Sequence, residues 1–173
     1  MDNRGFSLLE LMVALAVLGV LLAIGVPAFG SLIDNQRMDS SVSSLLRSIN
    51  YARTEAIRRN RHITLAPVGG DWNNGWLTFI DGNHNGVPDP GDVVLQTEYP
   101  ARNQRLDANA NIASYLRYNA QGESELLNGG FQSGTFSFCP RQPEHEGRRL
   151  IINRIGRARV ERAAIASSIC RGD

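Results

Sequence analysis

Residues 6–29, near the start of the chain, form an almost unbroken apolar stretch. Residues 11–26 are all apolar or glycine, and the wider stretch 6–29 is interrupted only by Ser7, Glu10 and Pro27. An α-helix of this length extends over about 30 Å, the thickness of the hydrocarbon core of a bilayer. A helix that packs on a soluble core keeps a polar face, and this stretch has none. The pattern therefore predicts a transmembrane helix over residues 6–29.

A helical period persists beyond residue 30, although the chain becomes polar there. Apolar side chains recur in steps of three and four, at Met38, Val42, Leu45, Leu46, Ile49, Ala52, Ala56 and Ile57. This spacing places them on one face of a helix. We therefore expect an amphipathic helix over residues 30–61 that continues the apolar helix and packs on a core.

The remaining residues, 62–173, have a pattern typical of β-strands. Short runs rich in β-branched and aromatic residues alternate with Gly and Asn clusters, which favour turns. The runs lie at residues 62–65, 75–80, 93–95, 114–118, 134–138, 150–152 and 157–160. We predict an α+β fold in which a long N-terminal helix packs on a head of antiparallel strands.

Composition excludes several classes of protein. The 173 residues suffice for one domain, and with 42% hydrophobic and 20% charged residues the chain is not disordered. Two cysteines are too few for a disulfide-dense scaffold or a cysteine-based zinc site. The formal net charge is only +1, but it is unevenly distributed. Residues 69–125 carry eight acidic residues and three arginines, whereas residues 148–162 carry six arginines and one glutamate.

The basic segment predicts a hairpin with a charged face. Its arginines are Arg148, Arg149, Arg154, Arg157, Arg159 and Arg162. Gly156 permits a sharp turn between two strands, and strand alternation places Arg157 and Arg159 on the same face. Arginines spaced in this way can bind successive phosphates of a nucleic acid without selecting a base sequence. From the residues alone, an equally good interpretation is a solvated face, or one that pairs with an acidic surface of a neighbouring subunit.

No motif in the chain indicates catalysis. Residues 81–92 place Asp or Asn at positions 1, 3, 5, 9 and 12 of a calcium-type loop, with Gly at position 6. The short Asp at the last position and the strand-like flanks favour a rigid turn over a calcium site. The three histidines are scattered, and no Ser or Cys lies in a nucleophile motif. We expect no catalytic residue, no metal and no cofactor.

Glu10 is the unusual residue of the apolar stretch, because an ionised carboxylate in a membrane is costly unless it is paired. An N-terminal ammonium at Phe6 of a neighbouring subunit, one helical turn earlier, would be a suitable partner. The alternative is that Glu10 reaches the headgroup region. No small-residue cleavage site follows residue 29, so any processing has to occur before the helix.

The stretch from Gly5 to Leu11, Gly-Phe-Ser-Leu-Leu-Glu-Leu, followed by the apolar run, resembles the N-terminal signal and helix of type IV pilins. The resemblance implies that prepilin peptidase removes residues 1–5 by cutting between Gly5 and Phe6. It also implies that the new N-terminal Phe6 is methylated and that Glu10 assists packing into the filament.

The head carries a narrower resemblance. Residues 51–60, 72–79 and 81–92, together with Gly156-Arg157-Ala158-Arg159, resemble the FimT/GspH group of minor pilins and pseudopilins. FimT-like proteins bind DNA through a C-terminal Gly-Arg-x-Arg motif during natural transformation. The resemblance therefore implies DNA contacts for Arg157 and Arg159, and it favours the nucleic-acid interpretation of the basic hairpin. The other four arginines of the segment join the predicted DNA-binding set because they are positively charged and close in sequence to Arg157 and Arg159: Arg148, Arg149, Arg154 and Arg162.

Cys139 and Cys170 fall in the part expected to face the periplasm, which is an oxidising compartment. We expect a disulfide between them that closes a loop of about 30 residues, fixes the C-terminal tail and frames the basic hairpin. The alternative is two free thiols.

Taken together, these features predict a minor type IV pilin of the FimT-like kind. It would cross the inner membrane once, with its head in the periplasm, and become extracellular in the assembled pilus. Its expected partners are other major and minor pilins, prepilin peptidase, the inner membrane, and DNA bound without sequence preference during uptake. The alternatives are a purely structural minor pilin that primes pilus assembly and a GspH-like pseudopilin of a type II secretion system.

Overall fold

The computed structural model describes residues 8–142 and 145–171. The chain divides into two compact units, residues 1–36 and residues 37–173. Helix α1, Leu8–Arg59, contributes residues to both units. The helix was predicted to end near residue 61 and ends at Arg59. Two arginines, Arg58 and Arg59, occupy its last turn and complement the helix dipole.

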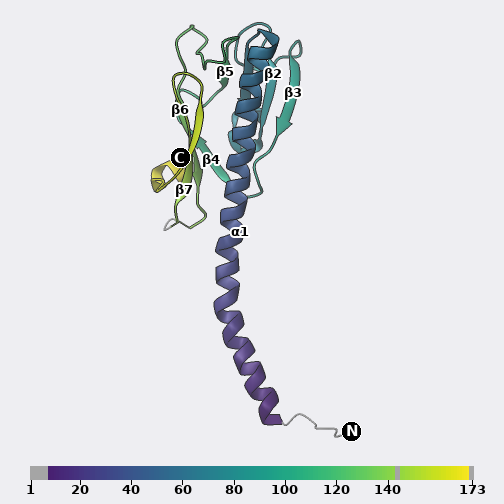
Figure 1. Ribbon diagram of the computed structural model, residues 1–173, viewed down its shortest axis with the longest axis vertical. Helices are drawn as coiled ribbons and strands as arrows, with labels where there is room; N and C mark the ends of the chain where they lie inside the picture. The colour runs from purple at the N-terminus through teal and green to yellow at the C-terminus, as the bar shows by residue number, and fades with distance from the viewer. Residues whose placement is uncertain (1–7, 143–144, 172–173) are drawn as a thin grey trace. The chain divides into compact units, whose positions relative to one another are not determined.

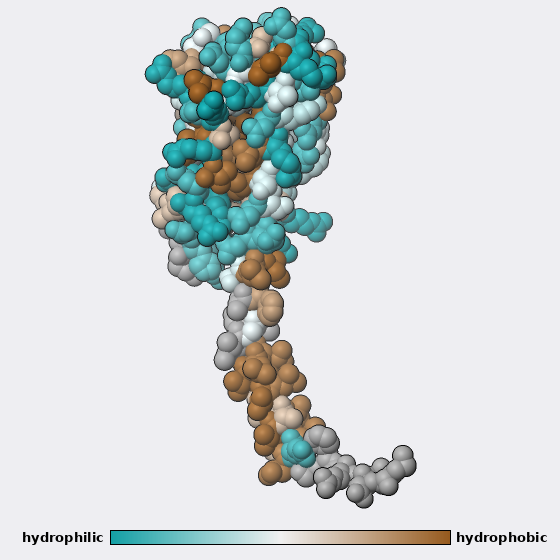
Figure 2. Space-filling model, in the orientation of Figure 1, coloured by the Kyte–Doolittle hydropathy of each residue, from teal (hydrophilic) through white to brown (hydrophobic). Residues whose placement is uncertain are grey.

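The first unit is the N-terminal part of α1, and its apolar side chains are exposed. Leu8, Leu9, Met12, Val20 and Leu21 are each more than 60% exposed, and Figure 2 shows this stretch as predominantly hydrophobic. Among the described residues, no helix combines the length and the apolar character needed to cross a membrane. The transmembrane helix expected over residues 6–29 therefore stays a prediction.

The second unit contains two four-stranded antiparallel sheets and the C-terminal part of α1 (Figure 1). The first sheet has the order β3-β2-β1-β5, with bounds Val93–Glu98, Trp76–Ile80, Ile63–Pro67 and Leu116–Tyr118. The second has the order β4-β6-β7-β8, with bounds Arg105–Ala108, Gly134–Cys139, Gly147–Ile152 and Ala158–Ala163. Short 3₁₀ segments lie at Val68–Gly70 and Trp72–Asn74, and helix α2 is Ser167–Arg171. The predicted α+β fold is confirmed. The sequence pattern indicated every strand except β4, which was not predicted.

A stripe on α1 supplies one wall of the core. The buried residues of this stripe follow steps of four and three along the helix: Met38, Val42, Leu45, Ile49, Ala52 and Ala56. They belong to one hydrophobic cluster that also includes inward side chains of both sheets, such as Leu65 on β1 and Leu150 on β7. Because each sheet has one apolar face, the shared helix allows both faces to leave water together.

Specific polar contacts fix how the sheets lie on the helix. The indole Nε1 of Trp76 on β2 donates to the Ser48 hydroxyl of α1 at 2.9 Å, deep in the core. On the second sheet, Arg148 of β7 reaches back to Asp39 of α1, with 2.8 Å between Nε and Oδ1. Only 7% of the Arg148 side chain is exposed, compared with 47% for Asp39. The arginine is therefore a buried cation whose counterion lies at the surface.

We expect Asp39→Asn to lower the free energy of unfolding by about 1–3 kcal/mol, because it leaves the buried guanidinium without a charged acceptor. Denaturant unfolding at neutral pH measures the change. In an Arg148→Met background, the same substitution should cost much less, because no buried cation remains. Equal losses in the two backgrounds would refute this role for the pair.

Candidate nucleic-acid interface

The β7–β8 hairpin presents two faces with different chemistry. Its register pairs Arg149 with Glu161 and Ile151 with Arg159, and these four side chains belong to the outer face of the sheet. The alternate positions lie on the opposite face, where Leu150 is fully buried and its partner Val160, on edge strand β8, is 41% exposed. Arg159 alternates with Ala158 and Val160 in this register, as predicted, whereas Arg157 precedes β8 and belongs to the turn.

The turn of the hairpin is held by one asparagine. The side-chain Oδ1 of Asn153 accepts hydrogen bonds from the backbone N–H groups of Ile155 and Arg157, at 3.1 and 2.9 Å. Backbone bonds from Asn153 N–H to the Arg157 carbonyl and from Gly156 N–H to the Asn153 carbonyl complete the turn. The backbone that carries Arg157 is therefore fixed before any ligand binds.

Gly156 attaches this turn to the first sheet. Its φ is +75°, and a Cβ built there would lie 2.7 Å from a ring carbon of Tyr118 and 2.9 Å from the Gly122 carbonyl oxygen. The hydroxyl of Tyr118, on β5, donates to the Gly156 carbonyl at 2.9 Å. Burial raises the pKa of this hydroxyl, so it stays protonated and remains a donor at neutral and moderately alkaline pH. Only glycine satisfies both the backbone conformation and the close approach.

The two arginines of the Gly-Arg-x-Arg segment are accessible. Arg157 is exposed, and the side chain of Arg159 is 69% exposed. Arg159 lies 3.2 Å from the carboxylate of Glu161 on the same face. An exposed pair of this kind contributes little to stability and can be exchanged for a phosphate oxygen. Arg149, on the same face, is partly buried and donates to the Ala164 carbonyl at 3.4 Å.

The other predicted arginines do not all join this face. Arg148 lies on the core side of β7 and is held by Asp39, so its assignment to an exposed DNA-binding set is corrected. Arg162 is exposed, but it is the cross-strand partner of Arg148 and therefore lies on the face opposite Arg159. Arg154 is exposed in the turn, and its guanidinium carbon lies 3.8 Å from the centroid of the Phe131 ring.

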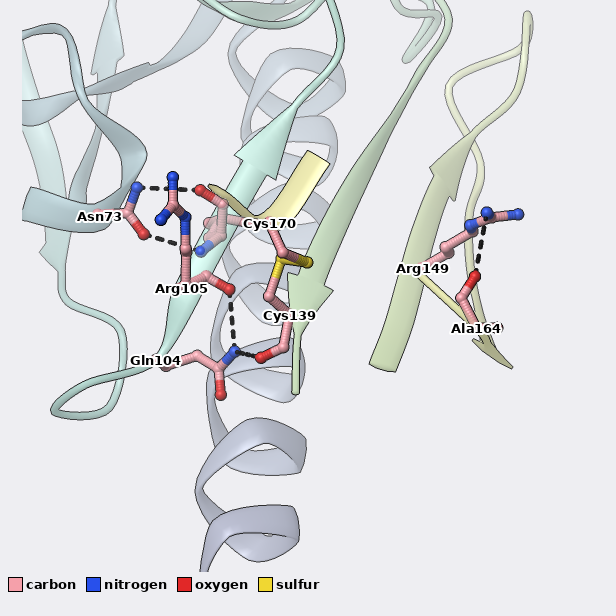
Figure 3. Close-up of a disulfide and its surroundings, with 8 residues drawn as sticks. Asn73, Gln104, Arg105, Cys139, Arg149, Ala164 and Cys170 are labelled. Atoms are coloured by element: carbon pink, nitrogen blue, oxygen red, sulfur yellow. Dashed lines mark hydrogen bonds between the residues drawn. A yellow bond between two sulfur atoms is a disulfide. The ribbon is translucent and has the colours of Figure 1, made fainter. Parts of the chain in front are cut away.

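The C-terminal tail is tied down covalently. Cys139, at the end of β6, and Cys170, in α2, form the predicted disulfide, with their Cα atoms 5.7 Å apart (Figure 3). Gln104 donates to the Cys139 carbonyl at 3.0 Å. A Cβ on Gly147 would lie 2.5 Å from Ile165, so this glycine makes room for the tail. The bridge thus encloses the whole β7–β8 hairpin.

The residues predicted to act in processing and assembly lie in the first unit. Glu10 occupies the first turn of α1 and is exposed. Gly5 and Phe6 lie outside the described residues.

The loop at residues 81–92 is a closed network of hydrogen bonds. The carboxylate of Asp81, which is buried, accepts from the N–H groups of Asn85 and Gly86 at 3.1 and 2.9 Å. Asp92 accepts from the N–H groups of Gly82 and Asp89 at 3.0 and 2.9 Å. Its carboxylates thus satisfy the backbone of the loop itself, as a rigid turn requires. In the part of the chain that the structure describes, no group of three or more His, Cys, Asp or Glu residues could hold a metal.

Sequence reasoning did not identify the residues that support the site. Asn153 and Tyr118 fix the turn, and Glu161 pairs with Arg159. Two of them, Asn153 and Glu161, could have been predicted from the sequence. An Asn three residues before a Gly is a usual turn signal, and Glu161 lies two residues after Arg159 on the same strand face. Tyr118 gave no signal, because it contacts Gly156 from 38 residues away.

Comparison with known families agrees with this architecture. A family model described as type II transport protein GspH matches residues 41–156. The chain belongs to the GspH family. A second model, the prokaryotic N-terminal methylation motif, matches residues 1–26. The GspH match covers α1 from residue 41 onward, strands β1 to β7 and the turn up to Gly156, and β8 lies beyond it.

Solved structures of a minor pilin share the fold. The type IV minor pilin FimU of Pseudomonas aeruginosa PAO1 is 22% identical and superposes with a TM-score of 0.58, over 75% of this chain and 92% of that protein. A second crystal form gives a TM-score of 0.54 at 23% identity, over 71% and 91% of the two chains. This GspH-family chain therefore has the type IV pilin fold, as predicted.

Two curated proteins match part of the sequence. The pilin-like protein PilA1 of Thermus thermophilus is 37% identical over 99 residues, which are 57% of this chain and 62% of that protein. The prepilin peptidase-dependent protein D of Escherichia coli is 31% identical over 88 residues, 51% of this chain and 50% of that protein. The chain thus spans 50 to 62% of these relatives.

The family and the fold together define the class of protein. The chain is a minor type IV pilin or a GspH-like pseudopilin, and both family and fold are those of pilin structural proteins rather than enzymes.

We expect Gly156→Ala to lower the free energy of unfolding by about 2–4 kcal/mol, because the methyl group meets Tyr118 and the backbone while φ stays positive. Gly91→Ala is the matched control, since a Cβ there meets no atom within 4 Å. Thermal melting of both variants measures the difference. A Gly156→Ala variant as stable as the control would show that the turn is not fixed in this way.

Proposed function

We propose that this protein is a minor pilin that assembles into a type IV filament through α1 and binds DNA through the β7–β8 hairpin. The observation that carries the DNA part is the pair of exposed arginines, Arg157 on the fixed turn and Arg159 on the adjoining strand β8. The filament part depends on the exposed apolar surface of the first unit.

Assembly is supported by the chemistry of the N-terminal helix. Contiguous exposed apolar surface on a protein marks a surface that contacts other proteins or lipid. In this proposal, the helix first anchors the chain in the inner membrane, with the head in the periplasm, and then packs with other major and minor pilins. Glu10 assists that packing by pairing with the N-terminal ammonium of a neighbouring subunit.

Processing is supported by the N-terminal methylation motif at residues 1–26 and by the name of the Escherichia coli relative, which refers to a prepilin peptidase. In the proposal, the peptidase cuts between Gly5 and Phe6 and the new N-terminus is methylated.

We expect the intact mass of the protein from membranes to correspond to residues 6–173 plus one methyl group. A Gly5→Gln variant should keep residues 1–5, because a long side chain does not fit where the peptidase accepts glycine. Mass spectrometry of both proteins is the measurement. Wild-type protein that retains residues 1–5 would refute this part of the proposal.

The DNA interaction depends on charge and on the fixed turn. Arginines bind phosphate oxygens through two N–H groups at once, and contacts to phosphates carry no base sequence information. A phosphate that approaches Arg159 competes with the Glu161 carboxylate 3.2 Å away, and the charge on the DNA favours the exchange. Such a hairpin at the surface of a retractable filament would help to draw DNA inward during natural transformation.

A second candidate function is supported by the GspH match, because GspH is described as a type II transport protein. In that case the subunit belongs to a secretion pseudopilus, and the basic face pairs with acidic residues of neighbouring subunits. The Arg159–Glu161 ion pair is an example of such pairing within one chain. A purely structural minor pilin would use the same face in the same way.

We expect the full chain in detergent to bind a short labelled duplex with strong salt dependence. Arg157→Gln, Arg159→Gln should weaken binding and reduce the slope of log Kd against log salt by about 2, one unit for each lost phosphate contact. Arg61→Gln, Arg102→Gln is the matched control, because both residues are exposed and lie outside the hairpin. Fluorescence anisotropy at two salt concentrations measures the slope.

If the two double variants behave alike, the hairpin is not the site. If the wild-type protein does not bind at low salt, the DNA part of the proposal is wrong, and the arginines instead serve contacts with other subunits.

A further inference from the structure

A stacked pair of planar groups lies at the turn of the basic hairpin. The guanidinium of Arg154 covers the ring of Phe131 at 3.8 Å. The Phe131 side chain is nevertheless 55% exposed. A phenylalanine this exposed gains little from burial in the head, so its ring is free to contribute to a contact with a ligand.

The pair opens onto a cavity. A hollow of about 480 Å³ is lined by the apolar Phe131 and Ile155, by Arg154, and by the polar Asn119, Glu123 and Glu125. This volume lies within the range of natural small-ligand sites, which combine aromatic walls with a few polar groups. Ile155 is 47% exposed and adds apolar surface beside the pair.

The charges around the cavity disfavour a phosphate inside it. The Glu125 carboxylate accepts from Arg117 at 2.7 Å and from Asn119 at 3.0 Å. Burial acts to raise the pKa of Glu125, but the Asn119 hydrogen bond and the Arg117 charge outweigh it, so the pKa is lowered and the group is ionised. Glu123 adds a second carboxylate, whereas Arg154 is the cation of the lining. A flat, polar and uncharged group fits this environment better than an anion.

The cavity is continuous in sequence with the arginines proposed to bind phosphate. Arg154 and Ile155 belong to the turn that Asn153 fixes, and Arg157 follows two residues later. Arg154 and Arg157 thus lie on the same tight turn, so a nucleotide strand that contacts Arg157 passes close to the Arg154–Phe131 pair.

We propose that the Arg154–Phe131 pair and the adjoining cavity form a subsite for one unpaired nucleobase, so that the protein binds single-stranded DNA more tightly than duplex. The base extends the stack of guanidinium and ring, while the phosphates remain on the arginines. Bases in a duplex are stacked on each other and paired, and they cannot enter the cavity. This inference rests on the DNA-binding function proposed above.

The test compares Phe131→Leu with Tyr99→Leu in the full chain, with a labelled single strand and a duplex of the same length as probes. Tyr99 is a matched control, because it is an aromatic residue of the head that is 64% exposed and does not line the cavity. We expect Phe131→Leu to weaken single-strand binding by about tenfold, the loss expected for one stacked base. Duplex binding by this variant and both affinities of Tyr99→Leu should remain at the wild-type values.

A second measurement locates the base in the wild-type protein and so does not depend on a variant. A single strand containing 5-iododeoxyuridine is irradiated with the protein, and the crosslinked peptide is identified by mass spectrometry. We expect the crosslink at Phe131. A crosslink confined to other peptides would overturn the proposal.

The outcomes distinguish this inference from the function on which it rests. If Phe131→Leu binds the single strand as tightly as the wild type, or if duplex and single strand bind the wild type equally, the base subsite is wrong while the phosphate site stands. If the wild-type protein binds neither probe at low salt, the proposed function fails, and the subsite fails with it.

Discussion

Both sheets of the head depend on one apolar stripe of a single helix. The stripe from Met38 to Ala56 belongs to the same buried cluster as the inward side chains of the two sheets, so neither sheet has a separate core. Burial of apolar surface is the main favourable contribution to folding, and here it couples the two sheets thermodynamically. Loss of packing on one sheet exposes part of the surface that the other sheet needs.

Polar contacts fix the relative positions of the strands and the helix, which the apolar cluster alone does not determine. Apolar contact has no direction, whereas the Arg148–Asp39 and Tyr118–Gly156 contacts each join two specified atoms. The first holds β7 to α1, and the second holds the end of the hairpin to β5. With the hairpin fixed at both places, its outer face can carry Arg157 and Arg159 without taking part in the core.

Steps of three and four in the sequence predicted the apolar stripe of α1. Short runs rich in β-branched and aromatic residues, separated by turn signals, predicted seven of the eight described strands, and the cysteine pair was also predicted correctly. Strand β4 was missed because it is only four residues long, Arg-Leu-Asp-Ala, and contains none of the β-branched or aromatic residues that indicated the other strands. The placement of Arg148 could not be predicted, because its partner Asp39 is 109 residues away. Positive charge in a segment says nothing about which face of a strand will carry each residue.

The disulfide also determines how the head responds to mechanical load. Cys139 and Cys170, separated by 31 residues, close a covalent loop that contains all of β7 and β8. Tension applied at the turn near Arg157 is carried down both strands into the same covalent ring. Rupture of the strand ladder can therefore lengthen the hairpin only as far as this loop allows. In the proposed role, in which the subunit holds DNA while its filament shortens, such a loop would limit how far the hairpin extends while its hydrogen bonds break and reform.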